Sequence, residues 1–404
     1  MKLSSIQLKN FKRFTDLTIE NIPATAKLVL LIGSNGSGKS SVFDGFEVIN
    51  KLAKGEGIGT EILNNYYKKD KNENTIIITT DDCDNVVKIN NGNINITPKK
   101  QGFTGFSKAN FYGRTSFRQV PQLTRISLGQ SRFDIENDSD RPRLFIEKDN
   151  RFENDVEKIT GIILKEFYRT ENSKEKILEK YVQPINEALQ NIFGKQNGTR
   201  LQLLEIIPPL DGNVAQINFS KGNSEVHYNN LSAGEKEVFN ILVNLLSRRD
   251  LYQDTIYFFD EIDLHLNTKI QYNLMKEITD NWIPDSCQLW TASHSIGFID
   301  FANESDNAVI IDFDDLDFDR PQVLSPIAKD KMEVFEIAVN KEFISRFVQD
   351  KKIIFSENTD TPFYNNLNLE NTQFFNAIDK QDTFFKSINL NALALIDRDY
   401  ISDE

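Results

Sequence analysis

The chain has 404 residues, a formal net charge of −13 and 39% hydrophobic residues, which is enough for one large domain and a smaller second one. No apolar run approaches the ~18 residues that span a bilayer, and the first residues lack the apolar core of a signal peptide. Its two cysteines, Cys83 and Cys287, have no paired spacing, so we expect a cytoplasmic protein without disulfides, a zinc site or a membrane partner. The acidic charge disfavours indiscriminate binding to nucleic acid.

The first part of the chain predicts strands around one helix. Alternating apolar residues between Leu3 and Ile19 indicate two short strands joined by a basic turn at 9–13. The continuous apolar run at 27–32 is typical of a strand buried on both faces of a sheet, and a helical segment follows at 41–52. β-Branched residues over 75–97 predict strands or hairpins, with Asn91-Gly92 as a turn.

The middle of the chain is less regular. Residues 110–140 are rich in Arg and Ser, and we expect them to be irregular. The apolar spacing turns helical over 153–193, which predicts two helices that form a lobe at about 150–200. Two further strands are expected at 201–207 and 215–219.

A glycine-rich segment, Gly33–Ser40, matches the pattern G-x-x-x-x-G-K-[ST] and lies between the predicted strand and helix. Its glycines would let backbone N–H groups surround phosphates, and the following helix would add its positive N-terminal end. A hairpin that merely fits the pattern is the alternative, which the flanking elements disfavour. The residues expected to hold the nucleotide are Asn35, Gly36, Ser37, Gly38, Lys39, Ser40 and Ser41.

Two carboxylates follow an apolar strand predicted at 255–259. We expect Asp260 and the Ser40 hydroxyl to serve Mg²⁺, and Glu261 to polarise the attacking water. An acidic strand end by itself is a weak signal, but it is strong when it accompanies the phosphate loop.

The segment 231–237 places Ser232 and Gly234 at the start of an apolar helix, where they could form a second phosphate cradle. The plainer alternative is a helix cap in which Ser232 and Glu235 form a capping box. Further along, a strand over 288–293 ends in His294, and Asp263 lies in the loop after Glu261.

Together these motifs resemble the ABC-type ATPases of the SMC-like and OLD-like group. The resemblance implies an α/β head over residues 1–330, with mixed and parallel sheets, that binds ATP and Mg²⁺. It assigns Ser232 and Gly234 to the ATP of a second copy, so that a homodimer, or a higher oligomer, forms through the nucleotide. It also assigns γ-phosphate sensing to His294, a nucleotide contact to Lys12, and, with no spacing argument, a loop role to Gln119.

Short-armed members of this group are common in anti-phage defence, which suggests a sensor or scaffold ATPase that controls an effector protein or nuclease. The tail, 331–404, is expected to begin with a helix at 331–349. It then carries Glu357 after one predicted strand and Asp397 and Asp399 after another. These carboxylates resemble the metal ligands of a Toprim domain, so the alternative function is an ATP-regulated nuclease that cuts DNA or RNA.

The Toprim resemblance has two departures. Asn358 stands where that family usually has glycine, and the sequence stops at Glu404, before the remaining elements of such a domain. A truncated chain, a degenerate remnant used for docking, and a fold completed by another subunit are three explanations. An acidic pair of strand ends that binds no metal is a fourth reading.

Overall fold

The computed structural model forms two compact units, Met1–Ile337 and Ala338–Glu404. The described residues are 1–53, 75–80, 86–90, 93–97, 107–115, 151, 155, 159, 161–163, 174–196, 198–207, 216–263, 265–329, 352–357, 361–367, 369, 372–377, 380–389 and 393–395. No helix in these ranges is long and apolar enough to cross a membrane. The division of the chain near residue 330 and the lobe at 150–200 stay predictions.

A four-stranded sheet opens the first unit, with the order β14-β2-β1-β4. Its strands are β1 (Leu3–Phe11), β2 (Phe14–Ile19), β4 (Thr75–Thr80) and β14 (Pro321–Leu324). All pairs are antiparallel except β14 with β2. The basic turn is shorter than expected, because β1 continues to Phe11 and only Lys12 and Arg13 link the strands.

The hairpin expected within 75–97 is present as β5 (Val86–Asn90) and β6 (Asn93–Thr97). Asn90 pairs with Asn93, which leaves two residues to link the strands. The predicted Asn91-Gly92 turn itself lies outside the described residues.

The centre of the unit is a five-stranded sheet in which every pair is parallel. Its order is β13 (Ala308–Asp312), β3 (Leu28–Ile32), β12 (Gln288–Ala292), β11 (Ile256–Asp260) and β7 (Phe111–Arg114). All residues of β3, β11 and β12 are buried, as expected of a parallel sheet covered on both faces.

Strand β7 corrects the sequence analysis, which expected 110–140 to be irregular. Its four residues are all buried, and they pair with β11 from Phe111↔Ile256 to Arg114↔Phe259. The strand is difficult to recognise in the sequence because it contains the charged residue Arg114. In the fold, that side chain reaches the buried carboxylate of Asp155 at 3.4 Å.

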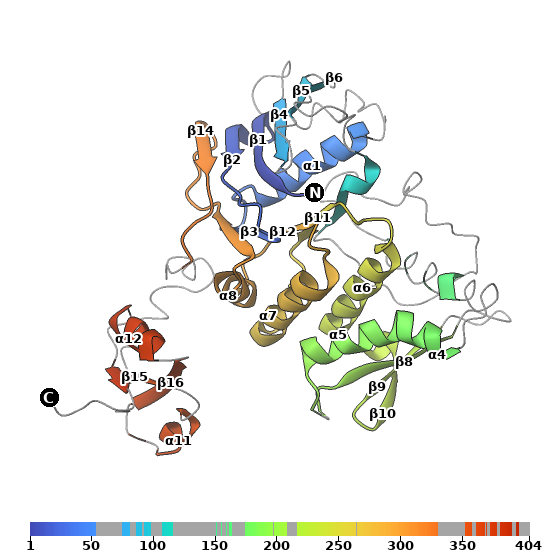
Figure 1. The fold of residues 1–404 in the computed structure, drawn as a ribbon, viewed down its shortest axis with the longest axis vertical. Coiled ribbons are helices and arrows are strands. Elements are labelled where there is room, and N and C mark those ends of the chain that lie inside the picture. The colour runs from blue at the N-terminus through green and yellow to red at the C-terminus, as the bar shows by residue number, and fades with distance from the viewer. Residues whose placement is uncertain are drawn as a thin grey trace. The chain divides into compact units, whose positions relative to one another are not determined.

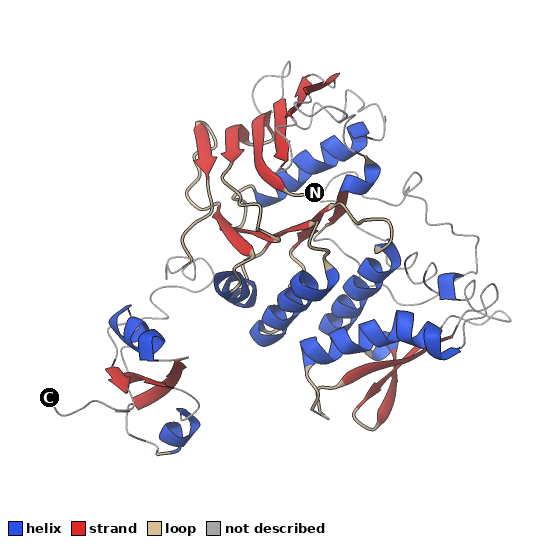
Figure 2. Ribbon diagram, viewed as in Figure 1, coloured by secondary structure: helices blue, strands red, loops and turns tan. Residues whose placement is uncertain are grey.

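Helix α1 (Lys39–Ala53) packs between the two sheets, whereas α6 (Ala233–Arg248), α7 (Thr268–Glu277) and α8 (Ile296–Glu304) lie on the opposite face of the parallel sheet (Figures 1 and 2). Phe46 of α1 stacks on Phe258 with ring centroids 4.0 Å apart and meets Trp290 edge-on at 5.3 Å. This aromatic cluster fixes α1, and therefore the loop that precedes it, against the sheet.

Helical segments and a three-stranded antiparallel sheet lie beside α6 and α7. The described helical segments include α4 (Lys174–Ile177), the π-helix η3 (Leu178–Val182) and α5 (Gln183–Phe193). The sheet has the order β10-β9-β8, from β8 (Leu201–Ile207), β9 (Gln216–Lys221) and β10 (Ser224–His227). Strand β10 was not predicted. Among the described residues of this unit are also three short segments: η1 (Lys108–Asn110), η4 (Tyr228–Asn230) and the π-helix η5 (Ile278–Trp282).

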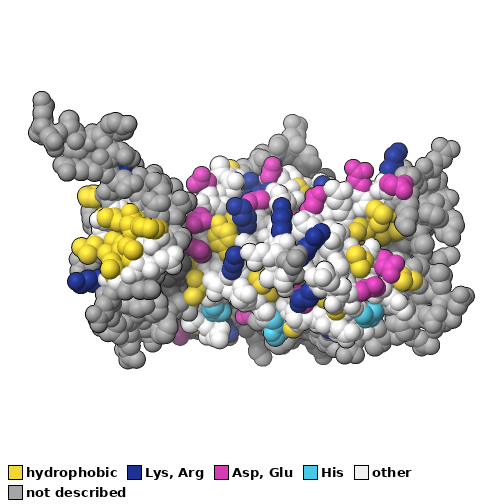
Figure 3. All heavy atoms as spheres, turned by 90° about the horizontal axis from the view of Figure 1, so that it is seen from below, with side chains coloured by type: hydrophobic (Ala, Val, Ile, Leu, Met, Phe, Trp, Pro, Cys, Tyr) yellow, Lys and Arg dark blue, Asp and Glu magenta, His cyan; other side chains and the backbone are white. Residues whose placement is uncertain are grey.

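The second unit is a small parallel α/β layer. Its elements are β15 (Lys352–Glu357), α11 (Thr361–Asn366), β16 (Thr372–Ala377), α12 (Lys380–Asn389) and β17 (Leu393–Leu395), with strand order β16-β15-β17. The strands β15 and β17 coincide with predicted ones, whereas β16 and α12 were not predicted. The helix expected at 331–349 lies outside the described residues. Apolar side chains gather on the surface of this unit (Figure 3), among them Phe363, Phe384 and Leu393.

Candidate nucleotide-binding site

The glycine-rich loop joins β3 to α1, as predicted, and its backbone requires glycine. Gly33, Gly36 and Gly38 have φ angles of 138°, 85° and 100°, a region that side chains with a Cβ rarely adopt. A Cβ at Gly38 would also lie 2.6 Å from Cζ of Phe14. The loop is therefore closely packed on the turn between β1 and β2.

Lys39 begins α1 and folds back over the loop. Its Nζ donates to the carbonyl oxygens of Gly33 at 2.6 Å and Ser34 at 3.0 Å. Burial lowers the pKa of Lys39, and the nearby carboxylates of Asp260 and Glu261 oppose that shift. The ammonium group therefore stands inside the loop and faces the acidic strand end.

The next residue, Ser40, donates its hydroxyl to Oδ2 of Asp260 at 3.1 Å. This contact joins the start of α1 to the end of β11 across 220 positions of sequence. A hydroxyl beside a carboxylate offers hard oxygen ligands, and Mg²⁺ commonly binds one or two carboxylates together with phosphate oxygens of the substrate. The pair therefore fits Mg²⁺.

Glu261 follows β11 with a φ of 49°, and its N–H still donates to the carbonyl of Ala292 at 3.0 Å. The positive φ turns the chain out of the sheet directly after Asp260. Glu261 thereby lines a cavity of about 540 Å³. The other lining residues are Lys12, Arg13, Asn35, Gly36, Gly38, Lys39, Ser40, Ser41 and Asp44. The fold thus brings Glu261 and the predicted loop residues, except Ser37, to one cavity.

Lys12 and Arg13 both line this cavity but contact different groups. Lys12 forms an ion pair with Asp44 of α1 at 3.1 Å. Arg13 instead donates to the carbonyl of Gly36 and lies over the ring of Phe318 at 5.3 Å. Arg13, next to the predicted Lys12, is thus a further cation in contact with the glycine-rich loop, and the nucleotide contact of Lys12 stays a prediction.

Asp314 is a loop contact that the sequence did not reveal. Its Oδ1 accepts the backbone N–H of Ser34 at 2.5 Å. Its negative charge also opposes the lowering of the pKa of Lys39 and of His294 that burial causes. Only a pattern that linked positions 280 residues apart could have found it.

His294 lies just beyond β12, as predicted. Burial lowers its pKa from 6.5, and Lys39 adds to this effect. The imidazole is therefore mostly neutral at pH 7. Within the part of the chain that the structure describes, Nε2 is buried and has no hydrogen-bond partner, so it can serve an oxygen of a ligand.

The segment at the start of α6 forms the capping box that the sequence allowed. Ser232 donates its N–H and hydroxyl to Oε2 of Glu235 at 2.9 and 2.8 Å, and Glu235 N–H donates back to Ser232 Oγ at 3.3 Å. Lys221 Nζ holds the other carboxylate oxygen at 2.6 Å. Ser232 itself is exposed, whereas Gly234 is buried. There is no room for a side chain at Gly234, because a Cβ there would lie 2.8 Å from the carbonyl oxygen of His265.

The remaining predicted residues have different outcomes. Asp263 accepts a hydrogen bond from Ser293 at 2.9 Å, which ties the loop after Glu261 to the end of β12. Gln119, Asp397 and Asp399 lie outside the described residues. Glu357 ends β15, and its side chain is not described. In the described ranges, no three His, Cys, Asp or Glu side chains gather as a metal site.

Residues 2–311 match the family model described as the RecF/RecN/SMC N-terminal domain. Solved structures with a similar fold include an Smc head bound to the C-winged helix domain of ScpA (14% identity, 82% of this chain and 99% of that chain, TM-score 0.47). An SMC head domain from Thermotoga maritima shares 13% identity (81% and 99%, TM-score 0.42). An Smc head with an extended coiled coil, bound to a ScpA domain derived from Pyrococcus furiosus, shares 15% (81% and 96%, TM-score 0.43). No curated protein matches the chain at a significant level.

Proposed function

Because the chain belongs to the RecF/RecN/SMC N-terminal domain family of ABC-type, SMC-like ATPases, we propose that its first unit binds ATP with Mg²⁺ and hydrolyses the β–γ phosphoanhydride. We propose further that two copies join head to tail with ATP between them. One observation carries this function: Ser40 and Asp260 are in contact at 3.1 Å, and Glu261 shares a cavity with the phosphate loop.

Binding would depend on the loop and the start of α1. The N–H groups of 34–40 and the positive end of α1 would hold the phosphates. Lys39 would exchange its loop carbonyl partners for β- and γ-phosphate oxygens. Ser40 and Asp260 would hold Mg²⁺, which when bound offsets the charge of the phosphates.

Hydrolysis would depend on Glu261 and His294. Glu261 would orient the attacking water and accept its proton. His294, mostly neutral and with Nε2 lacking a partner in the described structure, would donate an N–H to the γ-phosphate. Such donors stabilise the charge that develops in the transition state.

The proposal of a dimer rests on Ser232. It is the N-cap of α6, a helix of 16 residues, and the first N–H groups of a helix have no partner within it. Because Ser232 is exposed, this helix end is accessible to the phosphate of a second copy.

For the biological role we propose a cytoplasmic sensor or scaffold ATPase in anti-phage defence that controls an effector protein or nuclease. The support is the short insert that the sequence predicts at about 150–200 and the separate second unit. A nucleic-acid ligand has no support from the net charge of −13.

Two variants test the ATPase. Glu261→Gln should retain ATP, hydrolyse it slowly and accumulate a dimer in size-exclusion chromatography with ATP and Mg²⁺, because only the water-orienting charge is lost. Lys39→Ala should not bind ATP and should remain monomeric. A normal turnover rate in Glu261→Gln would contradict the role assigned to this carboxylate. Glu225→Gln, at an exposed glutamate of β10, is the matched control and should behave as wild type.

A second candidate, an ATP-regulated Toprim-like nuclease, has one structural argument. Strands β15 and β17 are parallel neighbours, with Ser356 paired to Leu395. Glu357 ends β15, and Asp397 and Asp399 follow β17 in the sequence. Carboxylates beyond adjacent parallel strands could share a divalent cation.

The nuclease is tested by incubating plasmid DNA or RNA with the protein and Mg²⁺ or Mn²⁺, with and without ATP. Cleavage that is lost in Asp397→Ala would support the nuclease. ATP turnover without cleavage would leave the ATPase proposal alone standing.

A further inference from the structure

A second cavity, of about 310 Å³, lies between α5, the end of α6 and the π-helix η5. Its size is at the lower end of the range of small-molecule sites. The residues that decide its chemistry are Pro184, Glu187, Leu245, Leu246, Arg249 and Trp282. None of them belongs to the nucleotide site.

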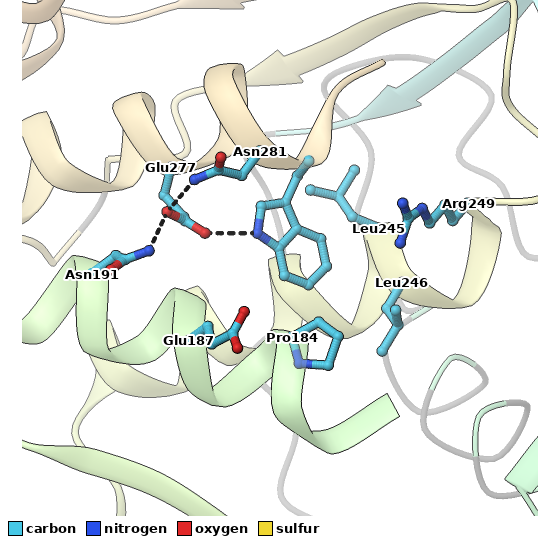
Figure 4. Close-up of a pocket in the computed structure, with 9 residues that line it drawn as sticks. Pro184, Glu187, Asn191, Leu245, Leu246, Arg249, Glu277 and Asn281 are labelled. Atoms are coloured by element: carbon cyan, nitrogen blue, oxygen red, sulfur yellow. Dashed lines mark hydrogen bonds between the residues drawn. The ribbon is translucent and has the colours of Figure 1, made fainter. Parts of the chain in front are cut away.

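One wall is fixed by the buried carboxylate of Glu277. Its oxygens accept N–H groups from Asn191 at 2.9 Å, Asn281 at 2.8 Å and the indole of Trp282 at 3.1 Å (Figure 4). A carboxylate has about four acceptor positions, so these three donors leave one. The indole ring is thereby held in one orientation, and α5 is tied to η5.

One π-helix, η5, lines this cavity, and the other, η3, ends directly before α5. Segment η3 leads directly into the turn of α5 that carries Pro184, and η5 supplies Asn281 and Trp282. π-Helices are rare and occur frequently at functional sites. Here the wider turn of η5 lets Trp282 donate to Glu277, five residues before it.

The cavity has an apolar body and a charged rim. Pro184, Leu245 and Leu246 lie against the half-buried Trp282. Glu187 and Arg249 are exposed at the rim, and Glu187 faces the cavity from α5 (Figure 4).

The charges around the cavity favour a cation. The lining residues include two carboxylates, Glu187 and Glu277, and one guanidinium, Arg249. The C-terminal ends of α6 and η5 also lie in this region, and the C-terminal end of a helix carries a partial negative charge. A cation beside the Trp282 ring would gain cation–π attraction as well.

We propose that this cavity binds a small organic cation, an ammonium or guanidinium group on a short aliphatic chain. The charged group lies between Glu187 and the face of Trp282, and the chain packs on Pro184, Leu245 and Leu246. Because the occupant contacts α5, α6 and η5 together, it fixes α5 to the helix whose N-cap is Ser232. The proposal does not depend on the ATPase function.

Binding is measured on the full chain without nucleotide, at constant ionic strength. The probes are 1,4-diaminobutane and agmatine, with 1,4-butanediol as the uncharged match. Trp282 is a suitable reporter, because the chain has two tryptophans and the other, Trp290, is fully buried in the core. A saturable change in tryptophan fluorescence with either cation, and none with the diol, is the expected result.

Substitutions at the two rim residues should change the affinity for the cation in opposite directions. Glu187→Gln should weaken cation binding by about three- to tenfold, whereas Arg249→Gln should strengthen it. Both side chains are exposed, so the variants should unfold at the wild-type temperature. Isothermal titration calorimetry provides the affinities independently of the tryptophan signal.

Four results would overturn the proposal, and the first three are no saturable binding of either cation up to roughly 10 mM, equal binding of the diol, and the same affinity in both rim variants. Weaker binding in Arg249→Gln than in Glu187→Gln would mean that the cavity prefers an anion, which also overturns it.

Discussion

The start of α6 allows the contribution of a single charge to be measured. Oε1 of Glu235 accepts Lys221 at 2.6 Å, and Oε2 accepts the N–H and hydroxyl of Ser232 at 2.9 and 2.8 Å. Glutamine also forms capping boxes. The variant Glu235→Gln can therefore keep the bonds to Ser232 and lose mainly the ion pair with Lys221.

The expected loss is small. The side chain of Lys221 is 41% exposed, so solvent screens the pair, and we expect a loss of about 1 kcal/mol in unfolding free energy. For a unit that spans Met1–Ile337, the unfolding entropy is on the order of 0.7 kcal/mol per kelvin. The Tm should therefore fall by only about 1–2 °C.

The loss should depend on pH. Burial alone would raise the pKa of Glu235, but the hydrogen bonds from Lys221 and Ser232 outweigh it, so the pKa lies below its ordinary 4.5. A carboxyl with a lowered pKa stabilises the fold above its unfolded pKa, and this is lost as the pH falls through the folded value. The difference in Tm between the wild type and Glu235→Gln should therefore have its full size at pH 7 and become smaller below pH 4.5.

Differential scanning calorimetry of the wild type, Glu235→Gln and the exposed control Glu225→Gln measures this. The control should leave the Tm unchanged at every pH. A Glu235→Gln difference that equals the control at pH 7, or that grows as the solution is acidified, would refute the reasoning about the charge.

Three further predictions concern the phosphate loop and its support. Gly38→Ala places a Cβ 2.6 Å from the ring of Phe14 at a φ of 100°. It should therefore abolish ATP binding in equilibrium dialysis and cost at least about 1 kcal/mol in thermal unfolding. Phe46→Ala opens the aromatic cluster between the sheets and should cost about 3–5 kcal/mol, a fall of roughly 4–7 °C in Tm; a shift below 2 °C would mean that the site collapses. Arg13→Ala should weaken ATP binding more than Lys12→Ala, because Arg13 contacts the loop whereas the Lys12 amine is on Asp44; the reverse order in dialysis would contradict this.

Much of the nucleotide site could be predicted because its signals are local. The apolar run of β3, the glycines after it and the start of α1 lie within about 25 consecutive residues. Glycine positions with positive φ and an apolar strand are properties of a short segment. The same holds for the strand before Asp260 and the cap at Ser232.

Long-range partners were not predictable in this way. Strand β7 pairs with β11 from Phe111↔Ile256, and its buried Arg114 forms an ion pair with the buried Asp155. Asp314 reaches Ser34 from a strand end that carries no motif. In each case the sequence near the residue suggests a solvated loop, and only the tertiary fold supplies the partner.

The close approach of Gly234 to the carbonyl of His265 has a consequence for a pair of such molecules. His265 is four residues after Glu261, so the helix end that would contact the phosphate of a neighbour abuts the segment that carries the carboxylate proposed to orient water in this chain. A displacement at one would press directly on the other. In an assembled pair, the nucleotide at one site would then affect the other site as well. The two copies would hydrolyse their nucleotides cooperatively and not independently.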